Sequence, residues 1–193
     1  MARESAAGLS LIELLLAMSL TMAAAGVAVP AMFEIERGLR LRAATSFAAG
    51  YLQHARLEAI RRSKNVGVRF RAAGDDWVLG MFADTNGNGI RTADILSGVD
   101  AALETELAFS ARASQVRIGR LQGVPDVNGV FGGEAVRFGA GGIASFDADG
   151  SASSGSLYLT DARTQIAITV TPATGRVRVR QWERRLGQWR QIR

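Results

Sequence analysis

An uncharged apolar run from Leu14 to Phe33 constrains this chain more than any other feature. Twenty residues of helix, at about 1.5 Å each, cover the hydrocarbon core of a bilayer, which is about 30 Å thick. A soluble domain seldom contains such a run, so the sequence predicts a membrane-spanning helix. Glu13 lies at the start of the run, where a carboxylate is costly in lipid unless a positive group pairs with it.

The segment before this run is too short for an ordinary secretory signal, which needs a basic region, an apolar region and an Ala-x-Ala site. Gly8-Leu-Ser-Leu-Ile-Glu-Leu-Leu15 instead resembles the prepilin signal of type IV pilins and type II secretion pseudopilins. The resemblance implies a leader, residues 1–8, that prepilin peptidase removes after Gly8, with methylation of the new N-terminal Leu9. It also implies that Glu13 pairs with the N-terminal ammonium of a neighbouring subunit. An ordinary signal anchor with Glu13 at the membrane interface is the alternative.

Residues 34–62 are expected to continue the same helix beyond the spanning half, residues 9–33, with a kink at Pro30. Apolar residues recur there at a spacing of three to four, which predicts one buried face: Leu41, Ala44, Phe47, Ala48, Tyr51, Leu52 and Ala55. The stretch Ala55-Arg-Leu-Glu-Ala-Ile60 resembles one found at this place in the GspH/FimT-type minor pseudopilin family. Arg56 and Glu58 within it are interpreted as solvated charges on the outer face of the helix.

The remainder, residues 63–193, has the alternation and the turn residues of β-strands. Expected strands are 66–71, 77–82, 103–108, 115–121, 136–138, 155–160, 165–171 and 176–182, and residues 123–133 are expected to form a loop. The first two strands are expected to pair as a hairpin around the turn Ala73-Gly-Asp-Asp76. Residues 144–180 resemble the C-terminal module of the same family, through Phe146, Gly150 and the later Gly175-Arg-Val. The resemblance implies an α+β, pilin-like fold, in which a long N-terminal membrane-spanning helix packs on a largely antiparallel sheet.

The segment Asp84-Thr-Asn-Gly-Asn-Gly-Ile-Arg-Thr-Ala-Asp94 partly matches a calcium-binding loop. Asp84, Asn86 and Asn88 provide oxygens at the first, third and fifth positions, and glycine follows at the sixth. The twelfth position, which needs a bidentate carboxylate, is Ile95. Asn-Gly and Asp are also ordinary turn residues, so a polar turn without a metal is the favoured interpretation.

Positive charge gathers in a basic tail, residues 175–193, which contains seven arginines and one glutamate, whereas residues 63–174 carry more acids than bases. The alternation of Arg176, Arg178 and Arg180 predicts one charged strand face. Arginine interleaved with tryptophan suits a phosphate backbone and its bases. Gly175-Arg-Val-Arg178 also resembles a motif of FimT-type competence pilins, which are associated with DNA capture. Possible DNA-binding residues are Arg176, Arg178, Arg180, Trp182, Arg184, Arg185 and Trp189. Anionic lipid and an acidic neighbouring subunit are alternative partners.

Catalysis is not expected, because the chain has no cysteine and a single histidine, His54, without a nucleophile at a telling spacing. No cofactor is expected either. The sequence therefore predicts a minor pseudopilin of a type II secretion system, anchored by one pass in the inner membrane with its C-terminal domain in the periplasm. Its expected partners are prepilin peptidase, other pilins or pseudopilins, the inner-membrane assembly machinery and membrane lipid. The alternative is a FimT-type type IV minor pilin that binds DNA through the basic tail.

Overall fold

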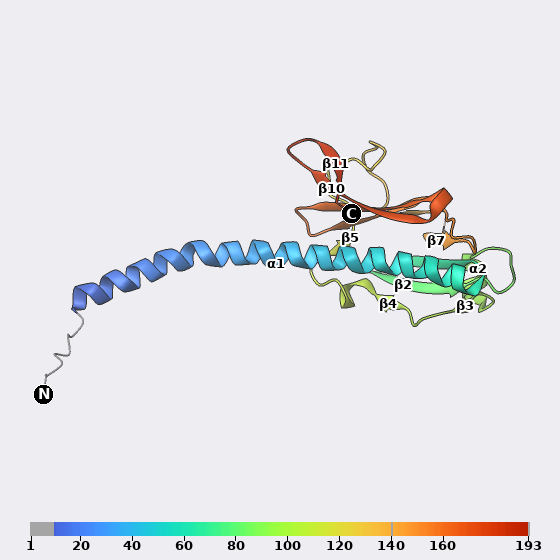
Figure 1. Ribbon diagram of the computed structural model, residues 1–193, viewed down its shortest axis with the longest axis horizontal. Helices are drawn as coiled ribbons and strands as arrows, with labels where there is room; N and C mark the ends of the chain where they lie inside the picture. The colour runs from blue at the N-terminus through green and yellow to red at the C-terminus, as the bar shows by residue number, and fades with distance from the viewer. Residues whose placement is uncertain (1–9, 140, 193) are drawn as a thin grey trace, which may run out of the picture. The chain divides into compact units, whose positions relative to one another are not determined.

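The computed structural model of the protein describes residues 10–139 and 141–192 (Figure 1). The predicted cleavage site, Gly8, and the predicted methylated residue, Leu9, lie outside these ranges. The chain divides into two compact units, Met1–Leu39 and Arg40–Arg193, which are described separately.

The described part of the first unit is helical from Leu11 onwards and belongs to the long helix α1 (Leu11–Arg62). The helix is continuous through Pro30, where only the amide donor is missing. Every residue from Ser10 to Glu36 is exposed. This half of the helix therefore has an apolar surface that nothing else in its unit covers.

The rest of α1, from Arg40 to Arg62, belongs to the second unit and has the buried face that its apolar periodicity predicts. The buried residues are Leu41, Ala44, Thr45, Ala48, Ala49, Tyr51, Leu52, Ala55 and Ala59. Five of these nine residues are alanine, so much of the buried face of the helix consists of small side chains. Gly50, by contrast, is exposed and a Cβ placed on it would contact nothing within 4 Å.

The first sheet follows the helix and has the strand order β3-β2-β1-β7, with β4 also paired to β2. Its strands are β1 (Val66–Ala73), β2 (Asp76–Ala83), β3 (Ala101–Ala102), β4 (Leu107–Ala108) and β7 (Ile143–Phe146). The predicted first hairpin is confirmed, since Ala73 pairs with Asp76 around a two-residue turn. Gly74 has a φ of +63°, which such turns require and which glycine adopts without strain. A short helix, α2 (Thr92–Ser97), which the sequence did not predict, connects β2 to β3.

The second sheet has the order β11-β10-β9-β8-β5, with β6 also paired to β8. Its strands are β5 (Arg117–Ile118), β6 (Val136–Phe138), β8 (Gly155–Thr160), β9 (Gln165–Thr171), β10 (Arg176–Glu183) and β11 (Gln188–Gln191). Two 3-10 turns, η1 (Phe109–Ala111) and η2 (Pro172–Thr174), complete the unit. The predicted basic tail is thus a hairpin of β10 and β11.

The core of the second unit joins the helix to both sheets. In Figure 1 the C-terminal part of α1 runs between strands of the first sheet and strands of the second. One continuous hydrophobic cluster contains residues from all three elements, among them Leu52 from α1, Val68 from β1 and Ile168 from β9. The α+β fold with antiparallel strands is confirmed, but the strands form two sheets rather than one. The expected strands 103–108 and 115–121 shrink to two-residue pieces, and 123–133 is a loop as predicted.

A polar contact ties α1 to the C-terminal module and corrects the interpretation of Arg56 as a solvated charge. Arg56 is half-buried, and its Nε donates to the carbonyl oxygen of Gly150 at 2.9 Å. Gly175 is buried beside this contact with a φ of +58°, and a Cβ there would lie 2.3 Å from the Gly150 oxygen. The residues that carry the family resemblance at opposite ends of the unit therefore meet at one point. Glu58, the other charge of that stretch, accepts hydrogen bonds from Arg61 and Arg62.

Two glycine-to-alanine changes should shift stability in opposite directions. Gly175→Ala places a methyl group against the Gly150 oxygen in a left-handed backbone, so we expect the free energy of unfolding to fall by roughly 2–4 kcal/mol. Gly50→Ala adds a methyl group to an exposed helix position and should raise it by about 0.5–1 kcal/mol. Thermal melts of the two variants beside the wild type measure both. If both variants were stabilised, or both destabilised, the packing of Gly50 and Gly175 described above would be contradicted.

Candidate functional site

The apolar half of α1 is the first candidate site. Among the described residues, α1 is the one helix long and apolar enough to cross a membrane, and its most apolar stretch has no buried residue. Its hydroxyl groups are compatible with lipid because they donate within the helix: Ser19 Oγ to the Leu16 oxygen at 2.8 Å and Thr21 Oγ1 to the Ala17 oxygen at 2.9 Å. These hydroxyl groups therefore need no hydrogen-bond partner outside the helix. The one charged side chain, at the start of the apolar run, is the exception.

That charge is Glu13, one residue before the uncharged run. Its backbone N–H donates to the Ser10 oxygen at 3.0 Å, within the first turn of α1. Its side chain is exposed and forms no ion pair with any residue that the structure describes. The carboxylate is thus presented outward on the helix without a cationic partner among residues 10–139 and 141–192.

A row of polar residues on the second sheet forms the other candidate site. Arg137 on β6 pairs with Ser156 on β8, Ser156 pairs with Thr169 on β9, and Thr169 pairs with Arg178 on β10. Directly paired residues share one face of a sheet, so two arginines flank two hydroxyls on the same face. Along β10, Val179 lies between Arg178 and Arg180 and is buried in the core. This confirms the predicted alternation of charged and buried residues on that strand.

This face is hollowed into an open groove of about 380 Å³, which we call the arginine groove. It is lined by Val127, Asn128, Arg137, Ser154, Gly155, Ser156, Thr169, Val170, Thr171, Pro172, Arg178 and Arg180. None of these lining residues is acidic. No carboxylate among the described residues lies within ion-pair distance of Arg178 or Arg180. The groove can therefore offer an anion several hydroxyls and two guanidinium groups that have no carboxylate partner among the described residues.

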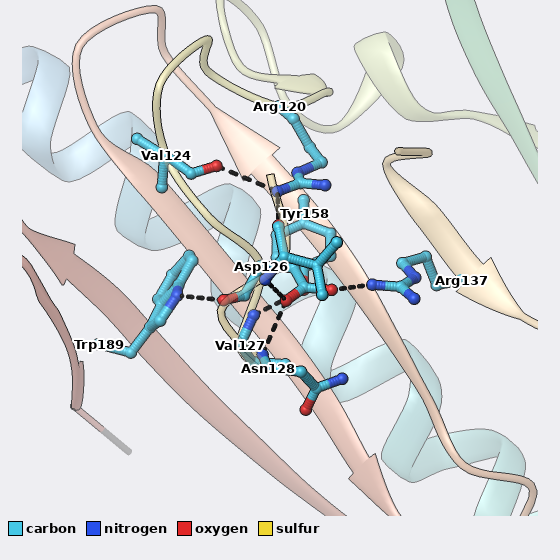
Figure 2. A network of polar contacts seen from close by, with 9 residues as sticks. Arg120, Val124, Asp126, Val127, Asn128, Arg137, Tyr158 and Trp189 are labelled. Atoms are coloured by element: carbon cyan, nitrogen blue, oxygen red, sulfur yellow. Dashed lines mark hydrogen bonds and ion pairs between the residues drawn. The ribbon is translucent and has the colours of Figure 1, made fainter. Parts of the chain in front are cut away.

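One wall of the groove is the loop 123–133, which a buried acid holds in place (Figure 2). Asp126 is fully buried, and its carboxylate accepts the backbone N–H groups of Asn128 and Val130, each at 2.8 Å, and an ion pair from Arg137. Burial by itself would raise the pKa of Asp126, but these hydrogen bonds and the Arg137 guanidinium together hold the pKa below its ordinary value. The acid is therefore charged at neutral pH and orders the loop.

Aromatic residues attach the same loop to the β10–β11 hairpin. The indole N–H of Trp189 donates to the Asp126 carbonyl oxygen at 3.0 Å, and the Val127 N–H donates to the hydroxyl of Tyr158 at 3.1 Å. The Trp189 ring lies 5.5 Å from that of Trp182 and 6.1 Å from that of Tyr158. Arg120 lies over the Tyr158 ring and donates to the Val124 carbonyl. Both tryptophans are half-buried in this packing, so the structure gives them a role in holding the hairpin.

The predicted DNA-binding residues are therefore separated in space. Arg178 and Arg180 line the groove, Arg176 is exposed at the start of β10, and Arg184 and Arg185 are exposed in the β10–β11 turn. Sequence reasoning missed Arg137 and Asn128, which also line the groove. The alternation of Val136-Arg-Phe138 placed Arg137 on a strand, but nothing in the sequence shows that β6 pairs with β8.

The weak calcium candidate forms a local turn. Asp84 accepts the N–H groups of Gly87 and Gly89 at 2.7 and 2.8 Å, and Asn86 Oδ1 accepts the N–H of Asn88 at 3.1 Å. Asn88 is exposed. Within the described ranges, no group of three or more His, Cys, Asp or Glu side chains could hold a metal ion.

Together these features define a single-pass, membrane-anchored protein with an α+β, pilin-like unit. The sequence model of a family described as type II transport protein GspH matches residues 43–175. The match covers more than half of the chain, so the chain belongs to this family, whose members are structural pseudopilins of type II secretion. The match ends at Gly175 and leaves the arginines of β10 outside it. No curated protein and no solved structure matches the chain.

Replacing Asp126 should weaken the fold in a pH-dependent way. Because the folded-state pKa is lowered, the charged carboxylate stabilises the fold above the unfolded pKa, about 3.8, and this contribution disappears as the pH falls through the lower folded value. We expect Asp126→Asn to lower the free energy of unfolding by about 2–3 kcal/mol at pH 7 and by less below pH 4. Urea unfolding at several pH values measures this. Asp75→Asn, at an exposed turn acid, is the control, and a pH-independent loss in the Asp126 variant would contradict the assignment.

Proposed function

We propose that this protein is a minor pseudopilin that assembles into a type II secretion pseudopilus through α1. Prepilin peptidase cleaves it after Gly8 and Leu9 is methylated. The chain then spans the inner membrane once, with residues 63–193 in the periplasm. The observation that carries the proposal is the wholly exposed apolar half of α1 with a single carboxylate, Glu13, at its start.

The physical chemistry of this helix links assembly to exit from the membrane. Large apolar side chains such as Leu16, Leu20 and Met22 are about 70% exposed and cannot enter water without a cost of roughly 1.5–3 kcal/mol each. The helix can leave lipid only where neighbouring helices of the same kind replace the lipid. A filament of packed helices provides that environment, and the inner-membrane assembly machinery supplies the work.

Glu13 gives this packing a register. Cleavage after Gly8 creates a positive N-terminal ammonium four residues before Glu13, which is about 6 Å along a helix. An incoming subunit can therefore place its ammonium against the Glu13 of a neighbour displaced by about one helical turn. A buried carboxylate is tolerated when such a partner arrives with it, and unpaired it opposes packing.

Glu13→Gln should separate processing from assembly. The variant keeps Gly8 and the apolar run, so we expect the peptidase to cut it and the membrane to retain it. Without the carboxylate the ammonium of the neighbour has no partner, and incorporation into pseudopili should fall at least tenfold. Sheared filaments and membranes are probed with an antibody against the second compact unit, Arg40–Arg193, which we call the β unit. Glu36→Gln, in the same helix beyond the apolar run, is the matched control.

Gly8→Ala supplies the complementary variant, which should remain an uncut precursor in the membrane. Normal cutting of Gly8→Ala would refute the signal assignment. Wild-type incorporation of Glu13→Gln would refute the pairing role and leave the processing assignment standing.

The arginine groove favours a second candidate, a FimT-type type IV minor pilin that binds DNA. Support comes from Arg178 and Arg180, which line an open groove without any carboxylate partner among the described residues. Phosphate groups are suitable ligands, because guanidinium donates two parallel hydrogen bonds to them. No base-reading element accompanies the groove, so this binding would be tolerant of sequence and sensitive to salt.

A pair of charge-matched variants tests this candidate. Arg178→Gln with Arg180→Gln removes two charges from the groove, and Arg184→Gln with Arg185→Gln removes two from the exposed β10–β11 turn. If DNA lies in the groove, we expect the first pair to weaken binding of duplex DNA about tenfold or more, and the second to weaken it much less. Gel-shift titrations at two salt concentrations, with the compact unit Arg40–Arg193, measure both.

Equal losses in the two variants would indicate a diffuse attraction to the basic hairpin. Absence of binding by the wild type at low salt would exclude DNA and leave anionic lipid or an acidic subunit as the partner of the groove.

A further inference from the structure

The segment between β2 and β3 contains more acidic than basic residues. Residues 84–100 include three aspartates and one arginine, Arg91. Asp84 is 3% exposed and Asp100 is 2% exposed. None of the three acids forms an ion pair with a residue that the structure describes. Buried carboxylates in this situation need either hydrogen-bond donors or a cation.

Asp84 is satisfied by hydrogen bonds. Both of its carboxylate oxygens accept backbone N–H groups, from Gly87 and Gly89, and Asn65 Nδ2 lies 3.4 Å from Oδ2. The glycines adopt φ values of +76° and +85°, which lets the chain fold around the carboxylate. Asp84 therefore builds the turn and needs no further partner.

Asp94 and Asp100 are not satisfied in this way. Asp100 Oδ2 accepts the Arg91 N–H at 3.3 Å, but Asp100 Oδ1 is closed to solvent and has no hydrogen-bond partner. The same holds for Asp94 Oδ2. The backbones of the two residues meet, because the Asp100 N–H donates to the Asp94 carbonyl oxygen at 3.1 Å, and the remainder of Asp94 is half-exposed. Two buried carboxylate oxygens without donors thus occur in one loop.

We propose that this loop binds a divalent cation, with calcium as the fitting ion, through the carboxylates of Asp94 and Asp100. An unpaired buried carboxylate oxygen is costly, and a cation removes the cost at both residues together. Hard oxygen donors without sulfur or imidazole suit calcium, which also accepts irregular coordination completed by carbonyl oxygens and water. The ligands differ from the Asp84, Asn86 and Asn88 set that the sequence pattern suggests.

The donor set also sets the expected affinity. With two carboxylates and otherwise neutral ligands, the site resembles the weak class of extracellular calcium modules, with Kd values of about 0.1–1 mM. The ion would fix α2 and the start of β3 against the edge of β2, where β3 pairs with Phe82 and Ala83. Binding by the purified protein does not depend on processing or assembly, so it can fail or succeed independently of the proposed function.

Thermal melts of the full-length protein in nonionic detergent test the proposal. Trp77, Trp182 and Trp189 all lie in the compact unit Arg40–Arg193, so their fluorescence reports its unfolding. At about 10 mM calcium, roughly ten times the weakest expected Kd, the Tm should rise by roughly 3–6 °C over the value in EDTA at matched ionic strength. The double variant Asp94→Asn with Asp100→Asn should lose this rise. It should also melt no lower than the wild type in EDTA, because neither carboxylate oxygen that it replaces has a hydrogen-bond donor to lose.

Asp149→Asn is the control, since its carboxylate lies in an exposed turn and accepts the Ser151 N–H at 2.9 Å; the calcium rise should persist in it. Flow dialysis of the wild type with radioactive calcium should show one ion per chain, and it decides the question even if the double variant does not fold. An unchanged wild-type Tm with no bound calcium overturns the proposal and assigns the two oxygens to buried water. A rise that persists in the folded double variant overturns the choice of ligands.

Discussion

The alanine-rich stripe of α1 is the contact on which the β unit depends. Its small side chains let strands of two sheets approach one helix, so a single cluster joins residues such as Leu52, Val68 and Ile168. The same helix continues without interruption into the exposed apolar half that begins at Leu11. One continuous helix therefore has a buried face between Arg40 and Arg62 and an apolar surface with every residue exposed from Leu11 to Glu36.

Polar contacts then fix how the chain returns to this helix. Arg56 binds the Gly150 carbonyl beside the close approach of Gly175, which explains why glycine follows η2 at this position. Asp126 plays the equivalent part for the long loop 123–133, through Arg137 and the indole of Trp189. Each contact joins segments far apart in sequence, so each stabilises the topology as well as a local turn.

This distinction also explains what the sequence could predict. The helix and the β1–β2 hairpin follow from local periodicity and from one Gly-Asp turn, and both were predicted with nearly correct bounds. The strand alternation also placed Arg178 correctly on the outer face of β10. The arginine groove itself could not be predicted, because it needs β6 beside β8, a pairing set by long-range packing. For the same reason the sequence could not show that the indole N–H of Trp189, a predicted DNA-binding residue, donates to the Asp126 carbonyl oxygen.

Three buried acids in the β unit show three solutions to one electrostatic problem. Asp84 is surrounded by backbone N–H groups that its own turn supplies, and Asp126 combines such groups with the guanidinium of Arg137. In both cases the chain itself supplies the hydrogen-bond donors to the carboxylate. Asp100 has a single long hydrogen bond to one oxygen and nothing at the other, although it is as deeply buried as Asp84. The chain provides donors or a cation for the carboxylates of Asp84 and Asp126 but provides nothing for one oxygen of Asp100. The proposed calcium ion would provide the missing positive partner for that oxygen.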